Sequence, residues 1–122
     1  MSSDPRHQFG QWGEEQVAEF LRGHGFKVLE RGFRCRFGEI DIIAAKNGLL
    51  VFCEVKSRRR ADFTTPLEAV TPAKRRRLIK TAGWYLQRHD WDGELRFDVI
   101  SVLAAEGRKA RFEWIEDAFP WE

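Results

Sequence analysis

Two carboxylate residues, Asp41 and Glu54, lie on either side of an Asn47-Gly48 dipeptide within otherwise apolar segments. Asn-Gly is a strong signal for a two-residue hairpin turn, because both residue types tolerate a positive φ. Such a turn pairs Lys46 with Leu49, and counting along the two strands then places Asp41 opposite Glu54. Directly opposed Cβ atoms lie about 4.5 to 5.5 Å apart, where like charges repel. Since Mg²⁺ prefers carboxylate oxygens, the pair predicts a hydrolytic metal site.

The same register places Glu39 opposite Lys56. We expect a cross-strand salt bridge between them rather than metal binding by Glu39. Lys56 shares a face with Glu54, where it could assist an attacking water or stabilise the charge that develops on a phosphate; the sequence does not choose between these roles. The alternative for the whole group is a hairpin whose polar face meets water. That alternative leaves two facing carboxylates, Asp41 and Glu54, without a cation between them.

Hydrophobic periodicity and turn signals predict the elements that must position these side chains. Helices are predicted over 8–23 and, from a Thr71 N-cap followed by Pro72, to about residue 89. Strands are predicted over 26–33, 39–44, 49–56, 95–103 and 111–115. Alternation along the hairpin predicts a core face of Ile40, Ile42, Cys53 and Val55. The order αβββαβ(β) indicates an α/β fold with a central mixed sheet flanked by helices, in a single domain over residues 1–122.

The composition excludes several classes of protein. The 122 residues are 43% hydrophobic and 33% charged, which suits one globular domain with one core. No apolar run is long enough for a secretory signal or a membrane span, so we expect a cytoplasmic protein without membrane contact. Cys35 and Cys53 form no C-x-x-C motif and are expected to be free thiols. His7, His24 and His89 lack metal-ligand spacing and are expected at the surface.

Positive charge is concentrated in one part of the chain. Residues 54–80 hold nine basic and three acidic side chains, although the net charge of the whole chain is only +2. Basic side chains there could bind phosphates in a salt-dependent way that does not read base sequence; the alternative is a solvated basic face. The four residues 74–77 cannot share one helical face, and we expect Arg58 and Lys74 to make the contacts.

Among five tryptophans, only Trp91 is expected to be exposed for base stacking.

The segments Gly38–Asp41 and Phe52–Arg58 resemble the motifs of the PD-(D/E)xK nuclease superfamily, and more closely those of the YraN-like family of predicted endonucleases. The similarity spans residues 10–119. It includes Gly10, Gly13, Glu14, Arg34, Lys74, the Arg96-Phe97-Asp98 segment and the Ala118-Phe119 segment. Three positions depart from the family pattern: Ile40 replaces the proline of the superfamily name, Gly32 replaces a common asparagine, and Thr64 replaces a common glycine.

The resemblance implies a restriction endonuclease-like fold and a Mg²⁺-dependent endonuclease, with Mn²⁺ as an alternative ion. It assigns metal binding to Asp41 and Glu54, a catalytic role to Lys56, and, less directly, a place beside the metal to Glu14. The implied substrate is DNA, and the candidate forms include branched recombination or repair intermediates. RNA is an alternative. Arg58, Lys74 and Arg34 are the nucleic-acid-binding residues that follow from the resemblance and from the basic segment.

Other functions stay open at this point, because the same fold also hosts inactive nucleic-acid binders. The main alternative is a non-catalytic DNA-binding or adaptor protein that retains the nuclease fold. A second is a structural partner in a recombination or DNA-uptake complex. Branched-DNA enzymes of this fold are often dimers, so a homodimer is also an open alternative.

Overall fold

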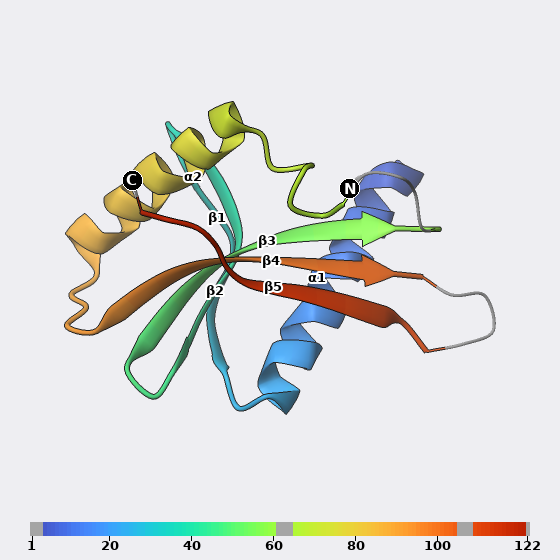
Figure 1. Cartoon of the computed structure of the whole chain (residues 1–122), viewed down its shortest axis with the longest axis horizontal. Coiled ribbons are helices and arrows are strands. Elements are labelled where there is room, and N and C mark those ends of the chain that lie inside the picture. Colours follow the sequence, from blue (N-terminus) through green and yellow to red (C-terminus); the bar gives the residue numbers. More distant parts are fainter. Residues whose placement is uncertain (1–3, 61–64, 105–108, 122) are drawn as a thin grey trace.

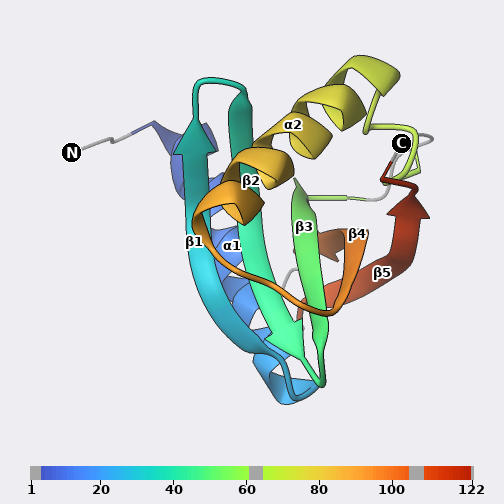
Figure 2. The same cartoon turned by 90° about the vertical axis from the view of Figure 1, so that its left-hand side faces the viewer.

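A mixed five-stranded sheet with one helix on each face forms the centre of the computed structural model, which describes residues 4–60, 65–104 and 109–121 (Figures 1 and 2). The strand order is β1-β2-β3-β4-β5. Only the β3–β4 pair is parallel, and the other three pairs are antiparallel, which confirms the predicted mixed sheet. The elements are α1 (Pro5–Gly23), β1 (Lys27–Cys35), β2 (Gly38–Lys46), β3 (Leu49–Arg58), α2 (Pro72–Arg88), β4 (Glu94–Leu103) and β5 (Arg111–Phe119). Thr64 lies outside the described residues.

Both helices begin at a capped proline. In α2 the Thr71 side chain accepts a hydrogen bond from the Lys74 amide at 3.2 Å, as predicted. Helix α1 begins at Pro5, three residues before the predicted start, because the Asp4 carboxylate accepts a hydrogen bond from the Arg6 amide at 2.9 Å and so caps an additional turn.

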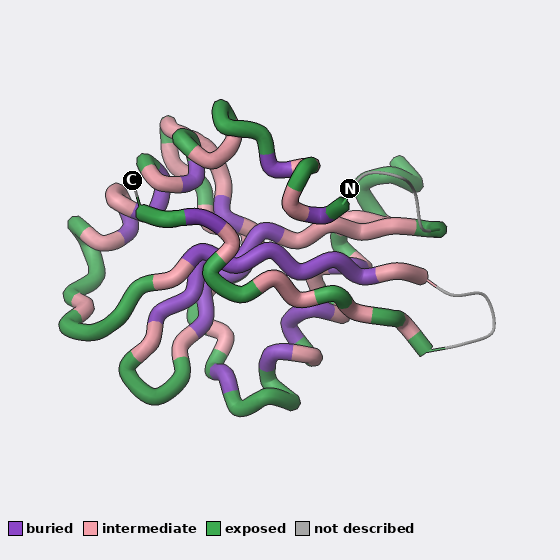
Figure 3. The backbone as a smooth tube through the Cα atoms, in the orientation of Figure 1, coloured by how far each residue is buried: buried purple, intermediate pink, exposed green. Residues whose placement is uncertain are grey.

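The two faces of the sheet carry separate hydrophobic cores, and buried residues run along the central strands (Figure 3). Helix α1 packs with Val17, Ala18 and Leu21 against one face, and α2 packs with Leu78, Ala82 and Tyr85 against the other. Each buried aliphatic or aromatic side chain stabilises the fold by about 1.5 to 3 kcal/mol. Both helices are therefore held firmly enough on the sheet to position the polar side chains that they carry.

The predicted hairpin turn is present, with φ of 49° at Asn47 and 81° at Gly48. The predicted register also holds for the first five pairs, from Lys46–Leu49 to Ile42–Cys53. The ladder then ends. Beyond it, β2 and β3 diverge, so that the start of β2 lies toward α2 while the end of β3 runs in another direction (Figure 1).

This divergence makes one prediction wrong. Ile40 was expected to share a core face with Ile42, Cys53 and Val55, but it packs in the core beneath α2. Ile42 and Cys53 are buried in the α1-side core, and Val55 packs against that core. Simple alternation fails here because it assumes a flat, continuous ladder.

The surface predictions have mixed outcomes. Cys35 and Cys53 are free, and the three histidines are exposed, as expected. Trp91 is half-buried against the α2-side core and donates a hydrogen bond to the Glu94 carbonyl at 3.0 Å, so the prediction of a freely exposed Trp91 is wrong. No helix within residues 4–60, 65–104 and 109–121 has the length and apolar character needed to cross a membrane.

Candidate active site

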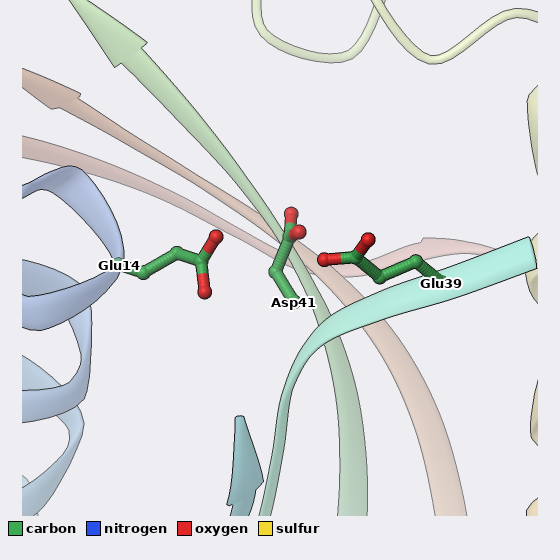
Figure 4. Close-up of side chains that lie close together, drawn as sticks. All are labelled: Glu14, Glu39 and Asp41. Atoms are coloured by element: carbon green, nitrogen blue, oxygen red, sulfur yellow. The ribbon is translucent and has the colours of Figure 1, made fainter. Parts of the chain in front are cut away.

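Acidic side chains from three elements converge where β2 leaves β3. Glu14 of α1 and Glu39 and Asp41 of β2 each place a carboxylate oxygen within 4.8 Å of the others. Figure 4 shows Asp41 between the other two, with Glu14 and Glu39 pointing toward it from opposite sides. Glu54 of β3, which is only 5% exposed, lines the same cleft as Asp41 and Glu39. The structure therefore brings Asp41, Glu54 and Glu14 together, as predicted, and adds Glu39.

Residue counting predicted that Asp41 and Glu54 are partners in the β2–β3 ladder, but the ladder ends before them. Instead, the Asp41 Oδ2 atom accepts a hydrogen bond from the Val55 amide at 2.8 Å; Asp41 lies one residue and Val55 two residues beyond the last ladder pair, Ile42–Cys53. The Asp41 side chain thus takes the place of a backbone acceptor at the point of divergence. Burial, followed by the negative charge of Glu54, raises the pKa of Asp41 to about 8.

Close packing of α1 on β3 determines the position of Glu14. A Cβ atom on the neighbouring Gly13 would lie 1.7 Å from the Ser57 Oγ atom and 2.9 Å from the Ser57 Cβ atom. Only glycine allows the helix to approach the strand this closely. Glu14 is half-buried as a result, and burial and then the charge of Glu39 raise the pKa of the Glu14 carboxyl.

Two lysines contact the same oxygen of Glu54. The Lys56 Nζ atom lies 3.5 Å from the Glu54 Oε2 atom, and the Lys74 ammonium of α2 forms an ion pair with that oxygen. Burial lowers the pKa of Lys56, and the charge of Lys74 adds to this effect against the opposing charge of Glu54. Burial also disfavours the charged form of Lys74, but its hydrogen bond to Glu54 and the charge of that carboxylate raise the pKa of Lys74 overall.

Glu39 does not pair with Lys56, contrary to the sequence prediction. Its Oε2 atom accepts a hydrogen bond from the Arg34 Nε atom at 2.8 Å, across the β1–β2 ladder in which these two residues are partners. Once β2 has left β3, its side chains face partners on β1 instead. Arg34 is thereby placed beside the acidic cluster, with 74% of its side chain exposed.

Two clefts adjoin this cluster and both are lined by Glu39. The cleft on the α2 side has a volume of about 210 Å³ and is lined by Asp41, Glu54, Lys74 and Arg77, among others. The cleft on the α1 side, about 410 Å³, includes Glu14 and Arg34. Sequence reasoning did not single out Arg77, although it lies one helical turn after Lys74 and hence on the same face of α2.

Arg58 is placed elsewhere. It lines a separate cleft of about 330 Å³ together with Ser101 and Arg111, and it is not among the described residues that line the two clefts beside the acidic cluster. Of the three predicted nucleic-acid-binding residues, the structure thus brings Lys74 and Arg34 to the cluster. A role for Arg58 there stays a prediction.

The Arg96-Phe97-Asp98 segment, which contributed to the family resemblance, forms a separate buried network. Asp98 is 1% exposed and accepts two hydrogen bonds from Arg96, at 2.8 and 2.9 Å. It accepts two more from the Trp114 indole at 2.8 Å and from the Asp117 amide at 3.0 Å. Four donors saturate this carboxylate, and we therefore assign it a structural role at the irregular pairing of β4 with β5.

Gly32 accounts for one of the departures from the family pattern. Its φ is 62°, in the left-handed region. Asparagine and glycine are the two residue types that adopt this region most readily, so the exchange of one for the other preserves the local backbone.

The donor set of the acidic cluster fits a divalent cation. Carboxylate oxygens are the ligands that Mg²⁺ and Mn²⁺ prefer; Glu14, Glu39 and Asp41 offer oxygens within 4.8 Å of one another, and Glu54 lines one cleft together with Glu39 and Asp41. Glu54 is buried and Asp41 is half-buried, so their mutual repulsion is not relieved by bulk water. A cation bound among them would relieve it.

Comparison with known proteins agrees with the motifs. The profile described as "Uncharacterised protein family UPF0102" matches residues 13–102. A UPF0102 protein from Syntrophomonas wolfei subsp. wolfei is 44% identical over 113 residues, which cover 92% of this chain and 97% of that protein. A UPF0102 protein from Geotalea daltonii is 46% identical over 111 residues, which cover 90% of this chain and 87% of that protein. The chain therefore belongs to the UPF0102 family, which is the YraN-like family that its motifs resemble.

Proposed function

We propose that this protein is a metal-dependent nuclease that hydrolyses phosphodiester bonds in DNA. The observation that carries the proposal is the meeting of Glu14, Glu39, Asp41 and Glu54 beside Lys56 at the divergence of two strands. Acidic groups at a surface are common without a ligand. Here Glu54 is buried, Asp41 accepts a hydrogen bond from the backbone of β3, and Lys56 lies within reach of the Glu54 carboxylate.

Asp41 and Glu54 would hold Mg²⁺ or Mn²⁺, and Glu14 and Glu39 would complete the set of ligands or hold a water. When bound, the ion would polarise a phosphoryl oxygen and promote ionisation of a water. Lys56, whose Nζ atom lies 3.5 Å from a carboxylate oxygen of Glu54, a residue that lines the α2-side cleft, would assist the nucleophile or stabilise the negative charge that develops on the phosphate. Lys74 and Arg77 line the same cleft from α2 and would bind the nucleic-acid backbone.

The test is a cleavage assay on branched, single-stranded and duplex DNA with Mg²⁺ or Mn²⁺. Asp41→Asn and Glu54→Gln should abolish cleavage, and Lys56→Ala should reduce the rate by about 10²- to 10⁴-fold. Two exposed residues outside the clefts provide matched controls: Glu19→Gln on α1 and Lys109→Ala should cleave like the wild type. Cleavage that persists in both Asp41→Asn and Glu54→Gln would show that the activity does not come from this site.

A second candidate is a non-catalytic DNA-binding protein with the same fold. One observation favours it: Lys56 and Lys74 already contact Glu54, so this carboxylate is compensated by the protein itself. This candidate predicts salt-sensitive DNA binding that survives Asp41→Asn, Glu54→Gln and Lys56→Ala, without cleavage of any DNA form. The same set of variants therefore separates the two functions.

A further inference from the structure

Two aromatic side chains form a surface cluster outside both hydrophobic cores. Phe37 lies in the turn between β1 and β2, and Trp84 lies on α2; their ring centroids are 6.1 Å apart at an interplanar angle of 71°. Both side chains are half-buried. Among the described residues that pack on the two cores, Trp12 and Trp114 contribute their rings, whereas Phe37 and Trp84 do not. Core packing therefore does not account for this pair.

Three exposed cations surround the pair. The Arg36 guanidinium lies 4.8 Å from the Phe37 ring centroid and 5.7 Å from the Trp84 ring centroid. The Lys80 ammonium lies 5.9 Å from the Phe37 ring, and the Arg88 guanidinium lies 3.7 Å from the Trp84 ring. Within residues 4–60, 65–104 and 109–121, none of these three cations forms an ion pair with a carboxylate. Their charges are thus available to an anionic partner.

The aromatic pair adjoins the cleft of the candidate active site. Gly38, the residue after Phe37, lines that cleft, and a Cβ atom on Gly38 would lie 3.3 Å from the Thr81 Oγ1 atom of α2. Along α2, Lys74 in the cleft and Trp84 are ten residues apart, which is about 15 Å of helix. That length matches about four stacked nucleotides of one strand at 3.4 Å each.

We propose that Phe37 and Trp84 form a stacking platform for unpaired bases of a DNA strand whose backbone enters the cleft of Asp41 and Glu54. This inference rests on the proposed nuclease function and specifies its substrate as DNA with a single-stranded segment beside the scissile phosphate. Aromatic rings interleaved with cations suit a polyanion that also carries flat apolar faces. Bases within a continuous duplex are stacked on one another, so their faces cannot reach the two rings.

The exposed cations do not block the platform. A cation above a ring at an exposed site is held more weakly than a stacked base. Arg36 and Arg88 have long side chains and exposed positions, so they can move from the rings to neighbouring phosphates when a base arrives. The same residues would then bind the backbone of the strand whose bases stack.

The test measures binding of a labelled 15-nucleotide single strand and of a blunt hairpin duplex by fluorescence anisotropy, in EDTA so that no cleavage occurs. Trp84→Leu, which keeps an apolar side chain but removes the ring, should weaken single-strand binding about tenfold and leave duplex binding unchanged. Trp84→Phe should retain most of the affinity. Trp121→Leu, which alters a tryptophan that is 39% exposed and stacks on Phe97 instead, should match the wild type.

A second measurement needs no variant. A strand of equal length that lacks its bases should bind the wild type about tenfold more weakly than the normal strand, because phosphates alone cannot stack. Equal binding of the two strands would overturn the platform, as would a Trp84→Leu variant that loses single-strand and duplex affinity equally. If Trp84→Leu is poorly folded, Phe37→Leu serves in the same comparison.

These outcomes are distinguishable from failure of the proposed function. If no DNA is cleaved but Trp84→Leu selectively loses single-strand binding, the platform stands without the nuclease. If cleavage depends on Asp41 while the ratio of single-strand to duplex affinity is the same in Trp84→Leu and wild type, the nuclease stands and the platform is wrong.

Discussion

Gly13 of α1 lies so close to Ser57 of β3 that any side chain at position 13 would overlap both side-chain atoms of the serine. The residue after this contact is Glu14, and the residue before Ser57 is Lys56. One close approach between a helix and a strand therefore positions two of the side chains that we assign to the active site.

Gly13→Ala should destabilise the protein by about 1 to 3 kcal/mol, because the new methyl group forces α1 away from β3. Alanine has the higher helix propensity, but this gain is smaller than the cost of overpacking. The measurement is the free energy of unfolding in urea.

Gly10→Ala is the matched control on the same helix. Nothing lies within 4 Å of a Cβ atom at position 10, so this change should stabilise the protein by about 0.5 to 1 kcal/mol. Equal effects of the two substitutions would contradict the role assigned to Gly13.

Without a divalent cation, the protein should become less stable as the pH rises from about 4 to 8. The pKa of Asp41 is raised from 3.8 to about 8 in the folded state, so between these values the folded chain binds more protons than the unfolded chain. Stability falls with pH wherever that is the case. Asp41→Asn should flatten this dependence and raise the stability of the metal-free protein at pH 8.

Urea unfolding at several pH values in EDTA provides the measurement, with Asp90→Asn at an exposed position as the control. Addition of Mg²⁺ should restore the stability of the wild type at pH 8 but not change Asp41→Asn. A wild-type protein whose stability rises between pH 5 and 8 in EDTA would contradict this prediction.

Glu14→Gln and Glu39→Gln should each weaken Mn²⁺ binding by at least about tenfold, because both carboxylates lie within 4.8 Å of Asp41. Calorimetric titration with Mn²⁺ alone measures the affinity. Glu19→Gln, on α1 but paired with Arg22, should bind Mn²⁺ like the wild type. If Glu39→Gln also binds normally, Glu39 is only the partner of Arg34.

Asp98→Ala should destabilise the protein by about 3 to 5 kcal/mol, because it leaves the guanidinium of Arg96 and the Trp114 indole without their buried acceptor. Glu116→Gln removes a 3.3 Å contact with the same arginine, but Glu116 is exposed, and the change should cost less than about 1 kcal/mol. Thermal unfolding of both variants measures the difference. Similar losses for both would show that Asp98 is not the centre of the network.

Local signals in the sequence predicted the elements well. The Asn47-Gly48 turn and the Thr71 cap act on neighbouring residues, so their consequences can be derived without tertiary structure. The boundaries were less accurate. Strand β5 continues to Phe119, four residues beyond the prediction, because pairing with β4 resumes after an irregularity, and the Phe119 side chain is buried.

The candidate site was predictable in its members but not in its pairing. Asp41 and Glu54 come together as residue counting suggested, yet beyond the end of the ladder, where the Asp41 side chain accepts a hydrogen bond from the Val55 amide. The contact of Lys74 with Glu54 and that of Glu39 with Arg34 both depend on where β2 leaves β3. No local propensity encodes that point, since it results from packing both faces of the sheet at once.

The parallel pairing of β3 with β4 also affects how the chain emerges during synthesis. Leu49 pairs with Glu94, so the second edge of β3 stays uncovered until some 45 further residues have been synthesised. Until then the apolar Val51-Phe52-Cys53 edge is an open template for a neighbouring nascent chain. Every carboxylate of the active site precedes β4 in the chain, and the strand that protects this edge from intermolecular association is translated only afterwards.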